Sequence, residues 1–469
     1  IYNSTWGTGN KYILFQADAN GNVTESNEAN NLAFAAITIN PDAVKAPGVT
    51  KFNQTGNTDI DALLSSYSYK WDTSVSNAVI TYSFLGSAGA ANYKSATNIT
   101  EIVTVSEVND AIKTNVRNIL KNLESFINVT FKEVADTATS YGVLRYMFAS
   151  ETSDYYAHAY NPSANLWIGG GDVHFNPFYE NDALNKFSGG IGSYGYGTII
   201  HESLHALGLK HPGNYNGNGT GQGPFLSGLV DNNTNSIMTY NDIGSNNTSP
   251  MAYDVRALQY LYGAKDNNSS NTTYSFSQVY GYNLGAQIFG SNNTSLKQTI
   301  WDNGGIDTLD LAGLSATQSY YLDLRENGIL TTSTAINSTS YIARGEGGSY
   351  KTSTFGTTIA YGTIIENLVN SRGNDTILAN SANNVFQGYS FGTNTGNDVY
   401  ELTSSSDILE LSSYSLSNLS TSIFGSDLKV TLGSYGSITV KNYYVSNNLM
   451  KFKVGNSYYR YISNTWQLA

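Results

Sequence analysis

The run of residues 201–211 restricts the fold of this chain more than any other feature. It reads His-Glu-Ser-Leu-His-Ala-Leu-Gly-Leu-Lys-His. His201 and His205 are four residues apart, so a helix places both imidazoles on one face, about one turn from each other. Gly208 can adopt a left-handed conformation that ends the helix. The returning chain then brings His211 towards the same point.

Three neutral imidazoles and one open position are the ligand set of a catalytic zinc ion. Glu202, next to His201, can reach a water molecule beside such an ion and act as its general base. A short His-Glu-x-x-His pattern can also arise by chance on a polar helix surface. Here, however, three of only five histidines in 469 residues lie in one run. The sequence therefore predicts one catalytic zinc ion on His201, His205 and His211.

The run matches the extended H-E-x-x-H-x-x-G-x-x-H pattern of the metzincin metalloproteases, and the chain resembles that clan. Residues 236–240, Ser-Ile-Met-Thr-Tyr, resemble the Met-turn that lies beneath the zinc, in the Met-x-Tyr form of the serralysins. Tyr240 follows His201 by 39 residues (240 − 201), which suits that subfamily. The resemblance implies a zinc endopeptidase in which Tyr240 is a displaceable zinc ligand that later hydrogen-bonds the oxyanion.

The composition narrows the class of protein. Zero cysteines exclude disulfides, thiol chemistry and cysteine-based zinc fingers. A net charge of −12 argues against nucleic acid as a partner. No run approaches the roughly 18 apolar residues that cross a membrane. Starting at Ile1 without a basic and apolar leader, the chain is expected to be a processed piece or a fragment. We expect a secreted, extracellular monomer, free or associated with the cell surface, that acts on proteins or peptides.

The N-terminal part does not resemble a protease. Residues 1–40 resemble the last hairpin of a CARDB-type immunoglobulin-like module, with a strand at 12–18 and a turn at 19–22. They are interpreted as the C-terminal remnant of such a module. Residues 41–56, which contain two prolines, are predicted to be a linker.

Residues 57–263 resemble a metzincin catalytic domain, a twisted and mostly parallel sheet with helices. Strands are predicted at 78–84, 129–134 and 142–149. A helix capped by Ser106 should bury an apolar face made of Ile112, Val116, Ile119, Leu120, Leu123 and Ile127. Another helix should begin at Pro250 and end at Gly263. The substrate is expected to lie extended along an edge strand near residues 164–176.

Residues 264–469 are predicted to form an all-β domain, a parallel β-roll or sandwich, which makes the whole chain α+β. Residues 301–310 resemble the calcium-wrapping segment of serralysins. The resemblance implies structural calcium ions, with ligands at Asp302, Gly304, Gly305, Asp307 and Glu366. The alternative is a polar Asp-Gly turn without an ion.

Two copies of the tripeptide Gly-Asn-Asp, which end at Asp375 and Asp398, match the core of the calcium-binding nonapeptide of repeat-in-toxin proteins. They are 23 residues apart (398 − 375), whereas two nonapeptides span about 18. An insertion near residues 389–391 is therefore expected to weaken the roll. One or two ions are predicted at these copies.

The two histidines outside the run, His158 and His174, resemble residues on the structural-zinc strands of matrixins. On neighbouring strands they could share an ion, with Asp154 as a third ligand. Ordinary hydrogen bonds of strand histidines are the alternative. The functional alternative for the whole chain is a calcium-binding adhesin or surface-layer-associated protein, either non-enzymatic or with the protease domain as an accessory part.

Overall fold

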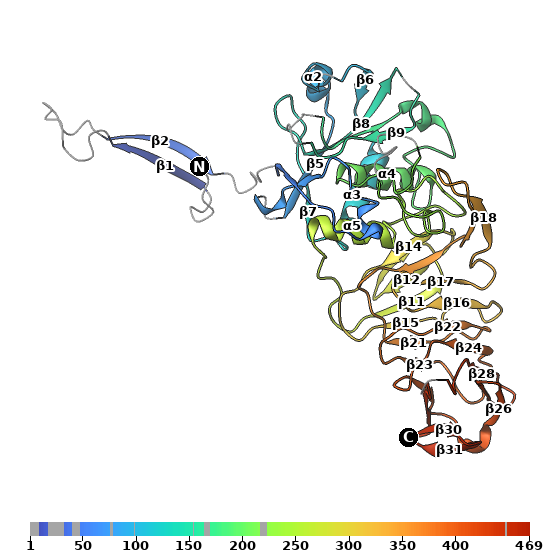
Figure 1. Cartoon of the computed structure of the whole chain (residues 1–469). Coiled ribbons are helices and arrows are strands. Elements are labelled where there is room, and N and C mark those ends of the chain that lie inside the picture. Colours follow the sequence, from blue (N-terminus) through green and yellow to red (C-terminus); the bar gives the residue numbers. More distant parts are fainter. Residues whose placement is uncertain are drawn as a thin grey trace, which may run out of the picture.

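The computed structural model describes residues 9–16, 32–39, 47–75, 78–97, 99–152, 154–163, 169–215, 223–445 and 448–469. Near the N-terminus, β1 (Gly9–Gln16) pairs antiparallel with β2 (Leu32–Ile39) (Figure 1). The strand expected at 12–18 therefore begins and ends earlier, and the turn expected at 19–22 lies outside the described residues.

Part of the expected linker 41–56 is a strand. β3 (Val49–Lys51) pairs antiparallel with β4 (Tyr69–Trp71), which belongs to the next segment of the chain. Phe52, directly after β3, packs against the buried core of that segment. The last residues of the expected linker are therefore held against the helical part of the molecule.

The first sheet has the order β7-β5-β8-β10-β9, and β6 also pairs with β8. Its strands are β5 (Val79–Phe84), β6 (Ile102–Ser106), β7 (Thr130–Glu133), β8 (Leu144–Glu151), β9 (Ala157–Ala159) and β10 (Asp172–Phe175). β5, β7, β8 and β10 are parallel, while β6 and β9 run antiparallel to their neighbours. The helices around it are α1 (Thr58–Asp61), α2 (Ser87–Thr97), α3 (Asp110–Leu123), α4 (Tyr194–Ala206) and α5 (Ala252–Tyr262).

The pairing corrects the expected place of the substrate strand. β10 lies inside the sheet, because β8 covers one of its sides and β9 covers the other. Among the described residues the outer strand at this end is β9. Residues 164–168 of the expected range lie outside the described residues.

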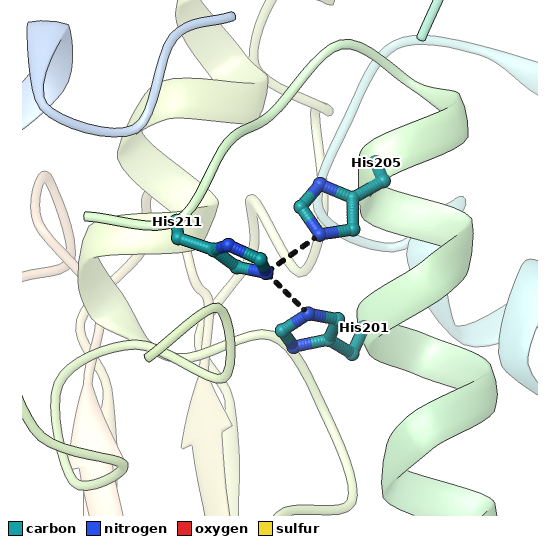
Figure 2. Close-up of side chains that lie close together, drawn as sticks. All are labelled: His201, His205 and His211. Atoms are coloured by element: carbon teal, nitrogen blue, oxygen red, sulfur yellow. Dashed lines mark hydrogen bonds between the residues drawn. The ribbon is translucent and has the colours of Figure 1, made fainter. Parts of the chain in front are cut away.

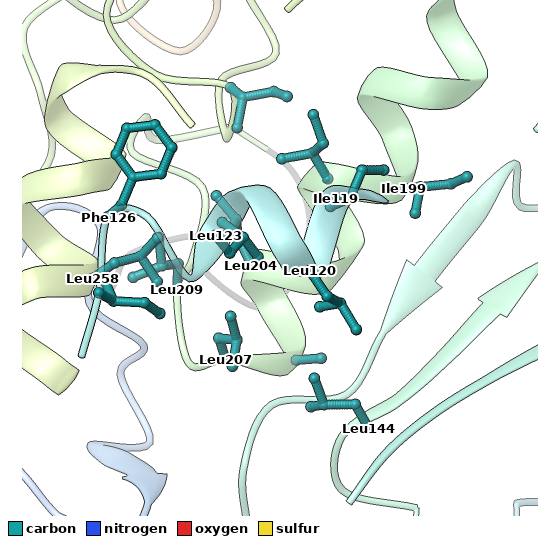
Figure 3. Close-up of a cluster of buried hydrophobic side chains, with 14 of the residues drawn as sticks. Ile119, Leu120, Leu123, Phe126, Leu144, Ile199, Leu204, Leu207, Leu209 and Leu258 are labelled. Atoms are coloured by element: carbon teal, nitrogen blue, oxygen red, sulfur yellow. The ribbon is translucent and has the colours of Figure 1, made fainter. Parts of the chain in front are cut away.

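The core of this part forms where α3 and α4 pack together over the sheet (Figure 3). The predicted apolar face of α3 and the following Ile127 are all buried, as is Leu204 on α4. Burial of each such side chain contributes about 1.5–3 kcal/mol. The expected N-cap of α3 was wrong by a few residues. Asn109 caps α3 by accepting a hydrogen bond from the Ile112 N–H at 3.0 Å, whereas Ser106 ends β6.

The second half of the chain is a column of strands that leads away from the helices (Figure 1). Within the described residues it contains two sheets, with the orders β13-β12-β11-β15-β21-β23-β25-β29-β30-β31 and β14-β20-β17-β16-β22-β24-β28-β27-β26. From β15 to β25 the chain passes repeatedly from one sheet to the other, and the strands pair in parallel along β15-β21-β23-β25 in one sheet and along β16-β22-β24 in the other. The β-rich class with accompanying helices is thus confirmed.

The first of these sheets consists of β11 (Thr273–Gln278), β12 (Gly281–Leu284), β13 (Gln287–Gly290), β15 (Thr308–Asp310), β21 (Asn367–Val369), β23 (Val385–Gln387), β25 (Ile408–Leu411), β29 (Lys451–Val454), β30 (Ser457–Ile462) and β31 (Thr465–Leu468). The second consists of β14 (Lys297–Ile300), β16 (Tyr320–Asp323), β17 (Ile329–Thr332), β20 (Gly356–Ile359), β22 (Thr376–Leu378), β24 (Asn397–Glu401), β26 (Ser420–Phe424), β27 (Asp427–Thr431) and β28 (Ser437–Val440). A separate hairpin joins β18 (Thr339–Ile342) to β19 (Ser349–Thr352).

The extra residues near 389–391 do not interrupt the roll. Thr376 pairs with Val399 in one sheet and Val385 pairs with Ile408 in the other, so the 23-residue interval is one full turn of the roll. Tyr389 is buried, and its hydroxyl donates to Asp398 Oδ2 at 2.8 Å. The additional loop thus contributes a buried tyrosine to the core, and the expected weakening of the roll stays a prediction.

None of the described helices combines the length and the apolar character needed to cross a membrane.

Candidate active site

The histidine run folds as a helix followed by a reversal of the chain. Ser193 caps α4 by accepting a hydrogen bond from the Tyr196 N–H at 3.2 Å. The helix ends beside Gly208, whose φ of +105° lies in the region that favours glycine. A Cβ there would lie 3.2 Å from the Tyr69 carbonyl oxygen. The reversal brings His211 back towards the side of α4 that carries the other two histidines (Figure 2).

The three imidazoles converge through the same ring nitrogen. The Nε2 atom of His211 lies 3.2 Å from that of His201 and 3.0 Å from that of His205. The Nδ1 atoms of His201 and His205 face the carbonyl oxygens of Ile237 and Leu209 at 2.8 and 2.9 Å. A carbonyl only accepts, so each Nδ1 carries the hydrogen and each Nε2 of the neutral rings is bare.

This donor set fits a zinc ion. The Nε2 atoms of His201 and His205 are bare, so among the three converging nitrogens only the Nε2 of His211 can carry a proton. Ligand atoms bound tetrahedrally at about 2.0–2.1 Å lie about 3.4 Å apart, close to the distances observed here. Burial lowers the pKa of His201 to about 4 and that of His205 to about 3, and burial and its two neighbours lower the pKa of His211 further. The rings therefore stay neutral, as metal binding requires.

The turn at 236–240 supports the first histidine. Asp254, on α5, accepts hydrogen bonds from the Ser236 hydroxyl at 2.6 Å and the Ile237 N–H at 2.7 Å. The Ile237 carbonyl then fixes the ring of His201, as partners of metal-binding histidines commonly do. Met238 is fully buried in the surrounding core. Sequence reasoning missed Asp254, although an aspartate in the first turn of the predicted helix was a visible signal.

Tyr240 lies beside the histidines. Its ring centroid is 4.2 Å from that of His211, and the ring stacks on Tyr215 at 5.1 Å. The Tyr240 N–H donates to the Tyr215 hydroxyl, which in turn donates to Asp231 Oδ1, each at 3.0 Å. Tyr215 and Asp231, which sequence reasoning also missed, hold the backbone of Tyr240 in place.

A cavity of about 410 Å³ opens in front of this group. His201, Glu202 and Tyr240 line it, and residues 154–157, next to the outer strand β9, form part of its wall. Glu202 is buried, which raises its pKa to about 8. Arg344, from the hairpin β18–β19, also borders the cavity. No sequence pattern pointed to Arg344, because it lies more than a hundred residues beyond the histidines.

The expected calcium ligands fall into two groups, and the first fits a cation. Asp302 and Asp307 are buried, and Asp307 Oδ2 has no hydrogen-bond partner among the described residues. Burial raises the pKa of Asp307 to about 7, and the nearby carboxylates of Asp302 and Glu366 add to the effect. Glu366 Oε2 accepts from the Asp307 N–H at 2.8 Å. Gly304 and Gly305 form the turn, and Gly305 has a φ of +118°.

In the second group, each carboxylate oxygen already accepts one hydrogen bond. Asp375 accepts from the Tyr320 N–H at 2.8 Å and the Ser371 hydroxyl at 2.5 Å, one at each oxygen. Asp398 accepts from the Asp375 N–H at 2.9 Å and from Tyr389. These carboxylates therefore join successive turns of the roll directly, and calcium on Asp375 and Asp398 stays a prediction.

The two remaining histidines, His158 and His174, also lie close together. His158 and His174 pair across β9 and β10. Their acidic neighbour is Glu151 and not Asp154, which instead borders the active-site cavity. The expected third residue was thus wrong, because β8 ends with Glu151 beside the histidines and the chain then turns away.

Comparisons with known proteins find similarity to serralysins and related metallopeptidases. Residues 267–463 match the family described as Peptidase M10 serralysin C terminal. The chain is 28% identical over 322 residues to Metallopeptidase AprA of Pseudomonas marginalis, an alignment of 66% of this chain and 61% of that protein. It is 29% identical over 303 residues to Serralysin of Proteus mirabilis, covering 59% and 56%. Serralysin A of Dickeya chrysanthemi is 30% identical over 275 residues, covering 55% and 51%.

The chain thus spans between half and about three fifths of the length of these relatives. The matched segment lies wholly in the roll, and the alignments cover more of the chain than that segment alone. In sequence, the chain is therefore similar to the serralysin metalloproteases.

Proposed function

We propose that this chain is an extracellular zinc-dependent endopeptidase. One observation carries the proposal: three imidazole Nε2 atoms converge, and backbone carbonyls fix the other nitrogen of two of these rings. Residues 57–263 would be the metzincin catalytic domain and residues 264–469 the calcium-binding domain. A bound zinc ion would supply a Lewis acid that activates water and polarises the scissile carbonyl.

The residues around the three histidines have separate roles in hydrolysis. Glu202, in the wall of the cavity, would accept a proton from the attacking water and later deliver it to the departing amine. Tyr240, beside His211, would donate a hydrogen bond to the oxyanion as charge develops there. The substrate backbone would pair with the outer strand β9, which adjoins the cavity.

Digestion of casein by the purified chain tests this proposal. Cleavage is expected in the presence of zinc, to stop when a zinc-selective chelator removes the ion, and to return when zinc is restored. A zinc-loaded, folded chain that leaves casein and other unfolded proteins intact would contradict the proposal.

Replacing Tyr240 with phenylalanine is expected to lower kcat on the order of a hundredfold and to change KM little. The reason is that the lost hydroxyl donates chiefly in the transition state. Steady-state kinetics on one peptide substrate measure both constants. Tyr458→Phe is the matched control, because it removes the same hydroxyl from an exposed tyrosine on β30, away from the cavity. A change in KM alone for Tyr240→Phe would assign the hydroxyl to ground-state binding.

We further propose that calcium binds at Asp302, Asp307 and Glu366 and stabilises the roll. At a concentration 100-fold above Kd, a bound ion stabilises the folded state by about 2.7 kcal/mol. Chelation of calcium should therefore make residues 264–469 susceptible to limited proteolysis while residues 57–263 persist.

Asp307→Asn should show the same susceptibility without a chelator, whereas Asp310→Asn, a partly exposed neighbour, should behave as wild type. Equal resistance of Asp307→Asn and wild type, with and without calcium, would contradict calcium at this turn.

A further inference from the structure

A second group of metal-ligating atoms lies outside the active site. Glu151 ends β8, while His158 on β9 and His174 on β10 are directly opposite each other in the antiparallel pair. Opposite residues of such a pair project from the same face of the sheet. Glu151 Oε1 lies 3.3 Å from His158 Nε2 and 3.1 Å from His174 Nδ1. Three strands thus deliver one carboxylate and two imidazoles to one point.

The hydrogen bonds around His174 determine which of its nitrogens is bare. The Tyr93 hydroxyl donates to Asp172 Oδ2 at 2.5 Å and lies 2.8 Å from His174 Nε2. A hydroxyl that has donated its proton can only accept, so His174 Nε2 carries the hydrogen. Its Nδ1 is then bare and faces the carboxylate of Glu151. Two acceptors at this distance require a proton or a metal cation between them.

The surroundings resemble the outer partners of known metal ligands. Metal-binding histidines usually donate their second N–H to an oxygen that is itself hydrogen-bonded. Tyr93 and Asp172 form such a chain, and Tyr93, Asp172 and His174 are all almost completely buried. The two ligand distances also approach the roughly 3.4 Å that separates ligands of a tetrahedral zinc ion.

Access and space are also suited to an ion. The side chain of His158 is 25% exposed, so the group can be reached from solvent. A cavity of about 10 Å³ adjoins Glu151 and both histidines. That volume is close to the minimum for one water molecule, which would complete a four-coordinate site.

We propose that Glu151, His158 and His174 bind a second zinc ion. The ion joins the outer strand β9 to β8 and β10. Because residues 154–157 form part of the active-site wall, the ion also steadies the strand beside which substrate would lie. The other possible occupant of the gap is a proton on Glu151, whose pKa burial raises.

Native mass spectrometry during titration of the apo chain with zinc measures how many zinc ions bind. This number distinguishes a zinc ion from a proton at Glu151, His158 and His174. The wild type is expected to bind two zinc ions, as is Glu202→Ala. His158→Ala and His205→Ala should each bind one, and the double variant His158→Ala/His205→Ala none. His158 is partly exposed, so its replacement is well tolerated by the fold, and circular dichroism checks this.

Tyr93→Phe keeps all three ligands but removes the hydroxyl that orients His174. It is expected to weaken zinc binding at this site by about 10–100-fold and to leave the other site unchanged. A purely structural hydrogen-bond network would show neither effect.

The proposal is overturned if the wild type binds only one zinc ion, or if His158→Ala and Glu151→Gln both still bind two. Either result would leave the proposed peptidase untouched, because its zinc is followed separately through His205→Ala and casein cleavage.

Discussion

Replacement of Glu202 with alanine is expected to lower kcat by about 10²–10⁴-fold, the usual contribution of a general base, and to leave the zinc bound. Glu202 is separate from the three converging nitrogens, yet it lines the same cavity. Its loss therefore removes proton transfer without removing a ligand. Peptide hydrolysis and zinc content, measured on the same preparation, test both parts of this expectation.

Two further variants make the result specific. Glu202→Gln keeps the size of the side chain but cannot accept the proton, so it should be as inactive as Glu202→Ala. Glu107→Ala removes an exposed glutamate that pairs with Lys113, and it should keep full activity. Near-wild-type turnover of Glu202→Gln would reject Glu202 as the general base.

Replacement of His205 with alanine is expected to remove both zinc and activity. His205 supplies one of three converging nitrogens, and a site left with two of its three histidines binds zinc poorly. Zinc analysis after dialysis and casein digestion measure the two losses. Because the Nδ1 of His205 also holds the Leu209 carbonyl, the variant is checked by circular dichroism for an intact fold.

His158→Ala is the matched control for this variant, since it removes a histidine outside the active site. It is expected to keep the zinc at His201, His205 and His211 and to cleave casein. Full activity of His205→Ala would contradict the proposed catalytic site.

The local parts of the site could be predicted from the sequence. The positions of His201 and His205 follow from the period of a helix, and the return of His211 follows from Gly208. These relations depend on neighbours within a few residues. The helical spacing of the apolar residues likewise predicted the buried face of α3, since one face of a helix packs on the sheet.

The supports of the site could not be predicted, because they depend on contacts between distant segments. Asp254 reaches the turn at 236–240 only because α5 packs beneath it. Glu151, and not Asp154, meets the histidines: its carboxylate reaches His174 from the end of β8, although the register of β8 and β10 pairs His174 with Met147. No pattern in a single segment contains this information.

The small error in the predicted helix cap and the unforeseen burial of Tyr389 also came from contacts between distant segments. Ser106 and Asn109 are both favourable helix caps, but β6 pairs with β8 as far as Ser106, which leaves Asn109 to begin the helix. The loop near Tyr389 looked like an interruption, since repeat spacing alone does not reveal that its tyrosine is buried between the sheets.

The central claim is that His201, His205 and His211 hold one zinc ion. X-ray diffraction from crystals of the zinc-loaded chain, recorded at the zinc absorption edge, locates the ion directly. An anomalous peak is expected about 2.0–2.1 Å from each of the three Nε2 atoms. The absence of a peak between these three rings, with zinc bound elsewhere or not at all, would contradict the claim.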